Sequence, residues 1–266
     1  MTIIFFPGQG SSKNLVRHEY TDNKYKRNNL IDKLSEIDDV HIADIPYVNV
    51  YYYNDLQKKM YEPIDNLLLS DLDLFIMTEK IFNQVKNLKK PYTLVASSHG
   101  IYYAFCFAYL YPKYVKNIIS LDGSWITNKL CKVRLANWKK KGKTIKLIKT
   151  QTELNVLVNN IKTLKDNDKY IKILMDHVRM KHTKDCIKYK LENMINRINY
   201  VVFRDFNSNI ENENYKEFNT NALMEHNELI DNQNYNIYWV IDAGHMCWYN
   251  KYYKKMILNV IRNIYL

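Results

Sequence analysis

The stretch YTLVASSHGIYYAF, positions 92 to 105, contains the serine most suited to chemistry. A β-forming run ends in ASSHG, and a helical pattern starts immediately afterwards. A serine at such a turn stands above the sheet at a helix N-terminus, where a nucleophile can be reached. Ser98 is in the G-x-S-x-G register, with Ala96 in place of the first glycine and Gly100 as the second. Ser97 is out of register and is expected to pack beneath the turn. The alternative is that the serines only N-cap a buried helix.

A serine hydroxyl is a weak nucleophile and needs a general base. Seven histidines occur, and His245 follows the strand-like run NIYWVID through Ala-Gly and precedes the last helical pattern. A histidine after the last strand lies on the same sheet edge as the serine and can reach Ser98. The orienting acid is expected one strand earlier, at Asp205 in INYVVFRD, where it fixes the imidazole tautomer. Asp122, in IISLDGSW, is the alternative acid.

The elements that must position these residues alternate along the chain, as α/β architecture requires. An amphipathic helix is predicted at 73–88, after the cap-like Ser70-Asp71, and further helices at 99–111 and 250–266. Residues 125–196 are lysine-rich, mostly helical in pattern and poor in strand signals. We therefore expect a core of residues 1–124 and 197–266, and an insertion of residues 125–196, called the insertion below. Strands are predicted at 2–6, 92–97, 115–122, 198–205 and 236–242. Residues 40–47 are expected to form a second strand or a loop, and 49–54 are ambiguous.

The order Ser98, Asp205, His245, each residue after its expected strand, resembles the α/β-hydrolase superfamily. The similarity covers almost the whole chain, although we expect no counterpart of the two outermost N-terminal strands of the family. The resemblance implies the α/β-hydrolase fold, with a mostly parallel central sheet flanked by helices. It also implies that the insertion is a mainly helical cap between two strands.

Within this resemblance, the N-terminal run TIIFFPGQGSS is a first strand followed by an oxyanion loop. Gly8, Gln9 or Gly10 would present one backbone N–H, and the N–H of His99 would supply the second. Such preorganised donors contribute roughly 3 kcal/mol each to transition-state stabilisation. FPGQGS also resembles the opening of acyl-carrier-protein acyltransferases, but those proteins usually have GHSxG around their serine. Their catalytic histidine is also not in the loop before a C-terminal core helix.

The resemblance implies a serine hydrolase that cleaves a carboxylic ester, thioester or amide through an acyl-enzyme on Ser98. By family analogy the substrate is a small or lipid-like ester. Trp125, Trp138, Met246 and Trp248 are candidates to line its pocket, or are ordinary core and hinge residues. Two alternatives remain open: a non-catalytic binding protein of the same fold, and an acyltransferase that uses the same serine.

The composition limits the remaining classes of function. The formal charge is +11 and the pI is near 9.2, which fits either an anionic partner or AT-rich codon usage that favours Lys, Asn, Ile and Tyr. The basic run at 137–149 has a single aromatic residue, Trp138, and no alternation of basic and aromatic residues, so no nucleic-acid partner is expected. No metal-ligand spacing occurs, and a serine triad needs no cofactor. The sequence does not indicate an oligomeric state.

Cellular location is inferred from the cysteines and the N-terminus. Four cysteines without paired spacing favour a reduced, intracellular protein, and Cys106 in an apolar run is expected to be a core residue. No apolar run of about 18 residues indicates a transmembrane helix. The N-terminal apolar run lacks a basic region before it and is broken by PGQG, so it is not expected to be a signal peptide. We therefore expect a cytoplasmic protein.

Overall fold

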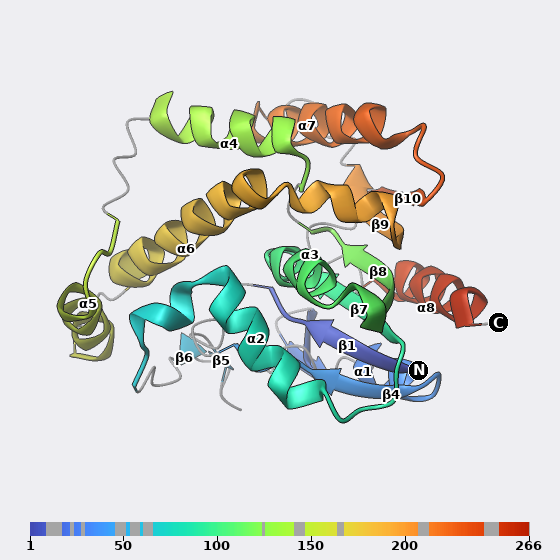
Figure 1. Cartoon of the computed structure of the whole chain (residues 1–266), viewed down its shortest axis with the longest axis horizontal. Helices are drawn as coiled ribbons and strands as arrows, with labels where there is room; N and C mark the ends of the chain where they lie inside the picture. The colour runs from blue at the N-terminus through green and yellow to red at the C-terminus, as the bar shows by residue number, and fades with distance from the viewer. Residues whose placement is uncertain are drawn as a thin grey trace.

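The centre of the molecule is a sheet of six strands in which every pair is parallel (Figure 1). From one edge to the other it contains β10 (Tyr235–Ile241), β9 (Asn199–Phe206), β8 (Val115–Leu121), β7 (Tyr92–Ser97), β1 (Thr2–Phe6) and β4 (Asp39–Ile42). The computed structural model describes residues 1–8, 18–21, 24–27, 30–45, 52–53, 59–60, 66–123, 126–140, 147–163, 168–206, 213–241 and 250–265.

Helices cover both faces of the sheet, as a parallel sheet requires. One face packs against α2 (Leu74–Val85) and α3 (Gly100–Leu110). The other packs against α1 (Leu30–Ser35) and α8 (Lys251–Tyr265). Alternate residues of each strand enter the two cores, because successive side chains point to opposite faces. In β1, for example, Ile4 and Phe6 enter the first core, and Ile3 and Phe5 the second.

The segment between β8 and β9 is helical. It contains α4 (Asn128–Lys140), α5 (Gln151–Thr163), α6 (Asp168–Tyr189) and a 3-10 helix at Leu191–Asn196. Figure 1 shows α6 running diagonally between α4 and the α2–α3 layer, with α5 at the end of the molecule far from α8. Helix α6 packs against α4, α5 and α2. Buried cysteines Cys131 and Cys186 lie in α4 and α6.

Six smaller elements and one further helix complete the described chain. Strand β2 (His18–Thr21) pairs antiparallel with β3 (Lys24–Arg27), and β5 (Tyr52–Tyr53) pairs antiparallel with β6 (Lys59–Met60). Two 3-10 helices lie at Leu69–Leu72 and Pro112–Tyr114, and α7 (Glu213–Leu229) follows β9. No helix in the described ranges is long and apolar enough to cross a membrane.

The sequence predicted the sheet well and parts of its surroundings poorly. The predicted strands at 92–97, 115–122, 198–205 and 236–242 correspond to β7, β8, β9 and β10, and the expected parallel sheet flanked by helices is confirmed. At 40–47 the structure has a shorter strand, at Asp39–Ile42.

Two local predictions were incomplete or wrong. Helix α7, which begins at Glu213, was not predicted. The cap of α2 is not Ser70-Asp71, because those residues lie in a 3-10 helix. Instead the Asp73 side chain accepts hydrogen bonds from the N–H groups of Phe75 and Ile76.

Candidate active site

Ser98 lies at a strained turn between β7 and α3. Its φ is +50°, in the left-handed region that only a few per cent of non-glycine residues adopt. The turn is held from both sides, because the Ser98 N–H donates to the Leu121 carbonyl at 3.4 Å and its carbonyl accepts from the Ile101 N–H at 3.4 Å. Backbone strain of this kind persists only where the surroundings enforce it, and it gathers at functional sites.

Two glycines let the chain after β1 approach this turn. A Cβ atom on Gly100 would lie 2.3 Å from the Phe6 carbonyl oxygen, so no other residue fits there without movement of the backbone. A Cβ atom on Gly8 would lie 2.9 Å from the Cβ of Ser98. The first residue of the expected oxyanion loop is therefore beside the serine. Gln9 and Gly10, the other two candidates, are outside the described residues.

The expected second oxyanion donor is the backbone N–H of His99, the residue directly before α3. The amides of a helix's first turn have no intrahelical acceptor, and the helix dipole adds partial positive charge at this end. Both effects favour negative charge close to the serine. Ser97 is buried, as expected for a residue beneath the turn.

The two candidate acids occupy different environments. Asp205 is the seventh residue of β9 and is buried, on the sheet face shared with Phe203 and covered by α8. Helix α8 starts at Lys251, six residues after His245 in the sequence. Asp122 directly follows β8, with φ at +48°, and its Oδ1 lies 3.7 Å from Nη1 of Arg204.

Arg204 is a buried charge that sequence reasoning missed. It donates through Nη2 to Oε2 of Glu225 at 2.7 Å and through Nη1 to the Gly123 carbonyl. Burial alone lowers the pKa of Arg204, but the charges of Glu225 and Asp122 outweigh it and raise the pKa overall. Oε1 of Glu225 also accepts from the Ile126 N–H at 3.0 Å. The cluster joins α7 and the chain after β8 to β9, and it engages Asp122 on the side away from α8.

The expected base and the expected pocket residues differ in whether the structure describes them. His245, Met246, Trp248 and Trp125 are outside the described residues. Trp138 lies on α4 and is half-buried, with the guanidinium of Arg134 5.7 Å from its ring centroid.

A pair of buried histidines connects the serine turn to α6. Nε2 of His182 faces the Leu72 carbonyl at 3.2 Å, so this nitrogen carries the proton and donates. Nδ1 of His182 therefore accepts from Nε2 of His99 at 2.9 Å. Burial lowers the pKa of His182 to about 3, and burial, reinforced by His182 and two arginines, holds the pKa of His99 well below its usual value. Both rings are neutral at physiological pH. Nothing in the sequence near His182 indicated this contact.

A second contact between α3 and the insertion lies one helical turn further on. The Tyr102 hydroxyl accepts from Nη1 of Arg134 at 2.7 Å and lies 3.1 Å from Oγ1 of Thr183. The Thr183 hydroxyl donates to the Arg179 carbonyl at 2.7 Å. The Tyr102 hydroxyl therefore accepts from an arginine and donates to Thr183.

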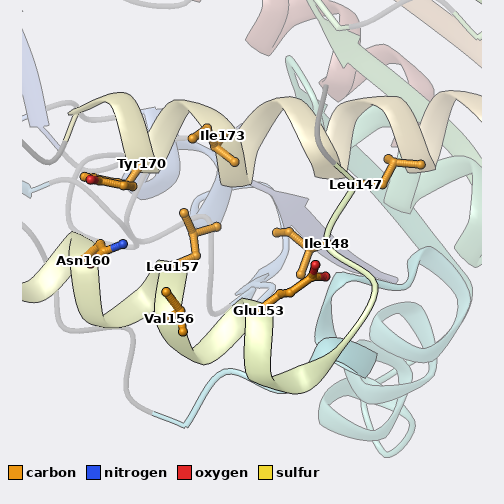
Figure 2. Close-up of a pocket in the computed structure, with 8 residues that line it drawn as sticks. All are labelled: Leu147, Ile148, Glu153, Val156, Leu157, Asn160, Tyr170 and Ile173. Carbon is orange, nitrogen blue, oxygen red and sulfur yellow. The ribbon is translucent and has the colours of Figure 1, made fainter. Parts of the chain in front are cut away.

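A separate apolar pocket lies between α5 and α6, with a volume of about 190 Å³ (Figure 2). Its lining residues are Leu147, Ile148, Glu153, Val156, Leu157, Asn160, Tyr170 and Ile173. The Glu153 carboxylate accepts from the Lys149 and Thr150 N–H groups before α5, so it has a local structural role. None of these residues belongs to the candidate active site.

Solved structures share this architecture at low sequence identity. MGS-MChE2, an α/β-hydrolase enzyme from a sediment metagenome of the Mar Chica lagoon in Morocco, is 10% identical, with 100% of this chain and 92% of that chain covered at a TM-score of 0.54. The monoacylglycerol lipase of Paleococcus ferrophilus is 12% identical, with 98% and 92% covered at a TM-score of 0.53. No family model and no curated protein sequence matches the chain. The strand order, the serine turn and these likenesses agree, and the chain has the α/β-hydrolase fold.

Proposed function

We propose that the protein is a serine hydrolase whose nucleophile is Ser98, with His245 as general base and Asp205 as the orienting acid. The observation that carries this proposal is the strained backbone of Ser98, two residues before α3. An N-capping serine has extended backbone angles rather than a positive φ, so the positive φ of Ser98 supports a nucleophile turn over a simple helix cap.

In the proposed reaction, Oγ of Ser98 attacks the carbonyl carbon of an ester, and its proton passes to His245. The carbonyl oxygen becomes an oxyanion that accepts from the His99 N–H and from an N–H of the loop after Gly8. The intermediate collapses, the C–O bond to the alcohol breaks, and His245 returns the proton to the leaving oxygen. A water then attacks the acyl-enzyme with His245 again as base, releasing the acid and restoring Ser98.

We assign the acid role to Asp205 rather than Asp122 on the basis of their surroundings. Asp205 lies on the face covered by α8, which begins six residues after His245. Asp122 is drawn toward Arg204 on the other side of β9. Asp205→Asn is therefore expected to lower kcat about 10⁴-fold by favouring the wrong imidazole tautomer. Asp122→Asn is expected to cost mainly stability, because it removes a partner of a buried arginine.

We also propose that the insertion serves as a cap over the substrate pocket. Its helix α6 contacts the serine turn through His182, and α4 contacts α3 through Arg134 and Tyr102. Because these contacts lie within one helical turn of Ser98, the insertion borders the space into which a substrate would enter.

The test is covalent labelling with a fluorophosphonate, read by intact mass. We expect one adduct on the wild type, none on Ser98→Ala, and strongly reduced labelling of His245→Ala. Ser97→Ala is the matched control, since the neighbouring serine is buried and out of register. It is expected to label like the wild type. An adduct that persists in Ser98→Ala, or no adduct on folded wild-type protein, would contradict the proposal.

A further inference from the structure

We propose that Arg134 and Arg179 bind an anionic group, a carboxylate or a phosphate, on the substrate that is cleaved at Ser98. The inference rests on the proposed hydrolase function, because it concerns the substrate of the same site. It adds the chemical class of that substrate. A neutral lipid-like ester is then not the preferred ligand.

The first argument is where the charge of the protein lies. The insertion has 18 Lys and Arg residues against 6 Asp and Glu, a net charge of +12. The remaining 194 residues have 21 basic and 22 acidic residues, a net charge of −1. Codon usage that favours lysine acts on the whole chain, so it does not explain a neutral core beside a basic insertion. The excess charge therefore points to a local role, the attraction of an anion.

The second argument is the arrangement of the two arginines. Arg134 comes from α4, and its guanidinium donates to the Tyr102 hydroxyl. Arg179 comes from α6, and its backbone carbonyl accepts from the Thr183 hydroxyl, which lies 3.1 Å from the Tyr102 hydroxyl. The two arginines therefore belong to the same contact between α3 and the insertion. Partial burial lowers the pKa of the Arg179 guanidinium, and the positive charge of Arg134 lowers it further. Two like charges brought together in this way repel one another, and an anion between them removes that cost.

Neighbouring groups keep both guanidinium groups in place. Arg134 is fixed by its bond to the buried Tyr102 hydroxyl and lies over the ring of Trp138. Nη1 of Arg179 is 4.0 Å from Oδ1 of Asp176, and the same carboxylate accepts from Lys172 at 2.6 Å. The Arg179 side chain is 42% exposed, so a solute can reach it. A planar guanidinium fork matches a carboxylate or phosphate with two parallel hydrogen bonds.

The third argument is the distance to the nucleophile. Tyr102 follows Ser98 by four residues, about 6 Å along a helix axis. The Tyr102 ring packs edge-on against the ring of His99, with centroids 4.8 Å apart. The pKa of His99 is lowered by burial first and then by the charges of His182 and the two arginines, in keeping with arginines close to the serine turn. An anion held there is one short acyl chain away from Ser98.

The experiment compares two esters that differ only in charge at the far end of the acyl chain: 4-nitrophenyl hexanoate and 4-nitrophenyl hemiadipate. We expect wild-type kcat/KM to be at least about tenfold higher for the hemiadipate, because one hydrogen bond to a charged group strengthens binding by at least about that factor. In the double variant Arg134→Gln/Arg179→Gln the ratio is expected to fall to about one. Both rates come from one sample, so partial misfolding cancels in the ratio.

The matched control is Lys132→Gln/Lys184→Gln, which removes the same charge from exposed positions of α4 and α6. This control is expected to keep the wild-type ratio. A wild-type ratio near one, or an equal loss in the lysine variant, would overturn the arginine site. Competition by inorganic phosphate and by adipate then separates the two kinds of anion, because the preferred one inhibits at lower concentration.

A second measurement does not depend on turnover. Ser98→Ala protein, with and without the two arginine substitutions, is titrated calorimetrically with monomethyl adipate and dimethyl adipate. Tighter binding of the monoanion that disappears with the arginines supports the site, even if no fluorophosphonate adduct forms and the hydrolase proposal fails. Equal binding of the two esters, or no binding of either, overturns the site even if labelling succeeds.

Discussion

The backbone of Ser98 predicts an unusual effect of glycine at the nucleophile. A left-handed residue with a Cβ atom costs roughly 1–2 kcal/mol, whereas glycine adopts the same angles freely. Glycine also lowers stability by roughly 0.5–1 kcal/mol, because it has greater conformational freedom in the unfolded chain. Ser98→Gly is therefore expected to be about 1 kcal/mol more stable than Ser98→Ala, although neither variant can be labelled at position 98. Both variants lack the hydroxyl, so its contacts cancel in the comparison.

The assay is equilibrium unfolding in urea, supported by thermal unfolding. In a protein of this size, 1 kcal/mol corresponds to a shift of about 2–4 °C in Tm. Lys190→Gly is a matched control, because Lys190 is exposed, has the same φ of +50° and lies in the turn after α6. It is expected to gain a similar amount. Ser97→Gly, in the extended strand β7, is expected to lose stability.

One pattern of results would refute this reasoning. If Lys190→Gly gains stability while Ser98→Gly is no more stable than Ser98→Ala, the serine is not held in a strained conformation. The main support for a nucleophile turn would then be lost. A gain at both positions, together with loss of labelling only at Ser98, would show that stability is exchanged for function at the candidate nucleophile.

Three further predictions concern the framework of the site. Arg204→Met is expected to lower the free energy of unfolding in urea by about 3–5 kcal/mol, because Glu225 stays buried without its partner. Arg204→Met/Glu225→Leu should recover part of that loss. A double variant whose loss equals the sum of the two single losses would contradict the pairing. Gly100→Ala is expected to cost about 3 kcal/mol, because its Cβ would meet the Phe6 carbonyl; a change below about 0.5 kcal/mol would contradict that close approach. The pKa of His182 is about 3 in the folded protein, against an ordinary value of 6.5 that applies to the unfolded chain. Between these two pH values the unfolded chain therefore binds one proton more at this residue than the folded protein does. Stability is then complete above about pH 6.5 and falls as the pH drops toward 3, and His182→Gln should show a smaller loss between pH 7.5 and 4.5.

The parts of the fold that the sequence predicts depend on local constraints. A buried parallel strand needs a continuous apolar run, and YTLVAS satisfies this within six residues. The serine turn needs small residues at fixed offsets, and Gly100 has the spacing that the close approach to Phe6 requires. These requirements can be read from neighbouring positions, so the predicted strands and the predicted turn agree with the structure.

The parts that were missed depend on distant partners. Helix α7 has a polar, asparagine-rich sequence, and one of its anchors is the buried Glu225, whose partner Arg204 lies 21 residues earlier. A buried charge is tolerated only because that partner is present, which no local pattern reveals. His182 likewise contacts His99 across 83 residues.

The two missed contacts of α6 link chemistry and recognition in the proposed site. His99 and Tyr102 lie one turn apart at the start of α3. They hydrogen-bond to His182 and Thr183 of α6, respectively. Because both hydrogen bonds span the same two helices, they fix how far α6 stands from the start of α3. Arg179 lies one turn before Thr183, so the same spacing sets the distance from its guanidinium to Ser98. The length of acyl chain that places an anion on the arginines and a carbonyl on the serine is therefore determined by this histidine and tyrosine contact.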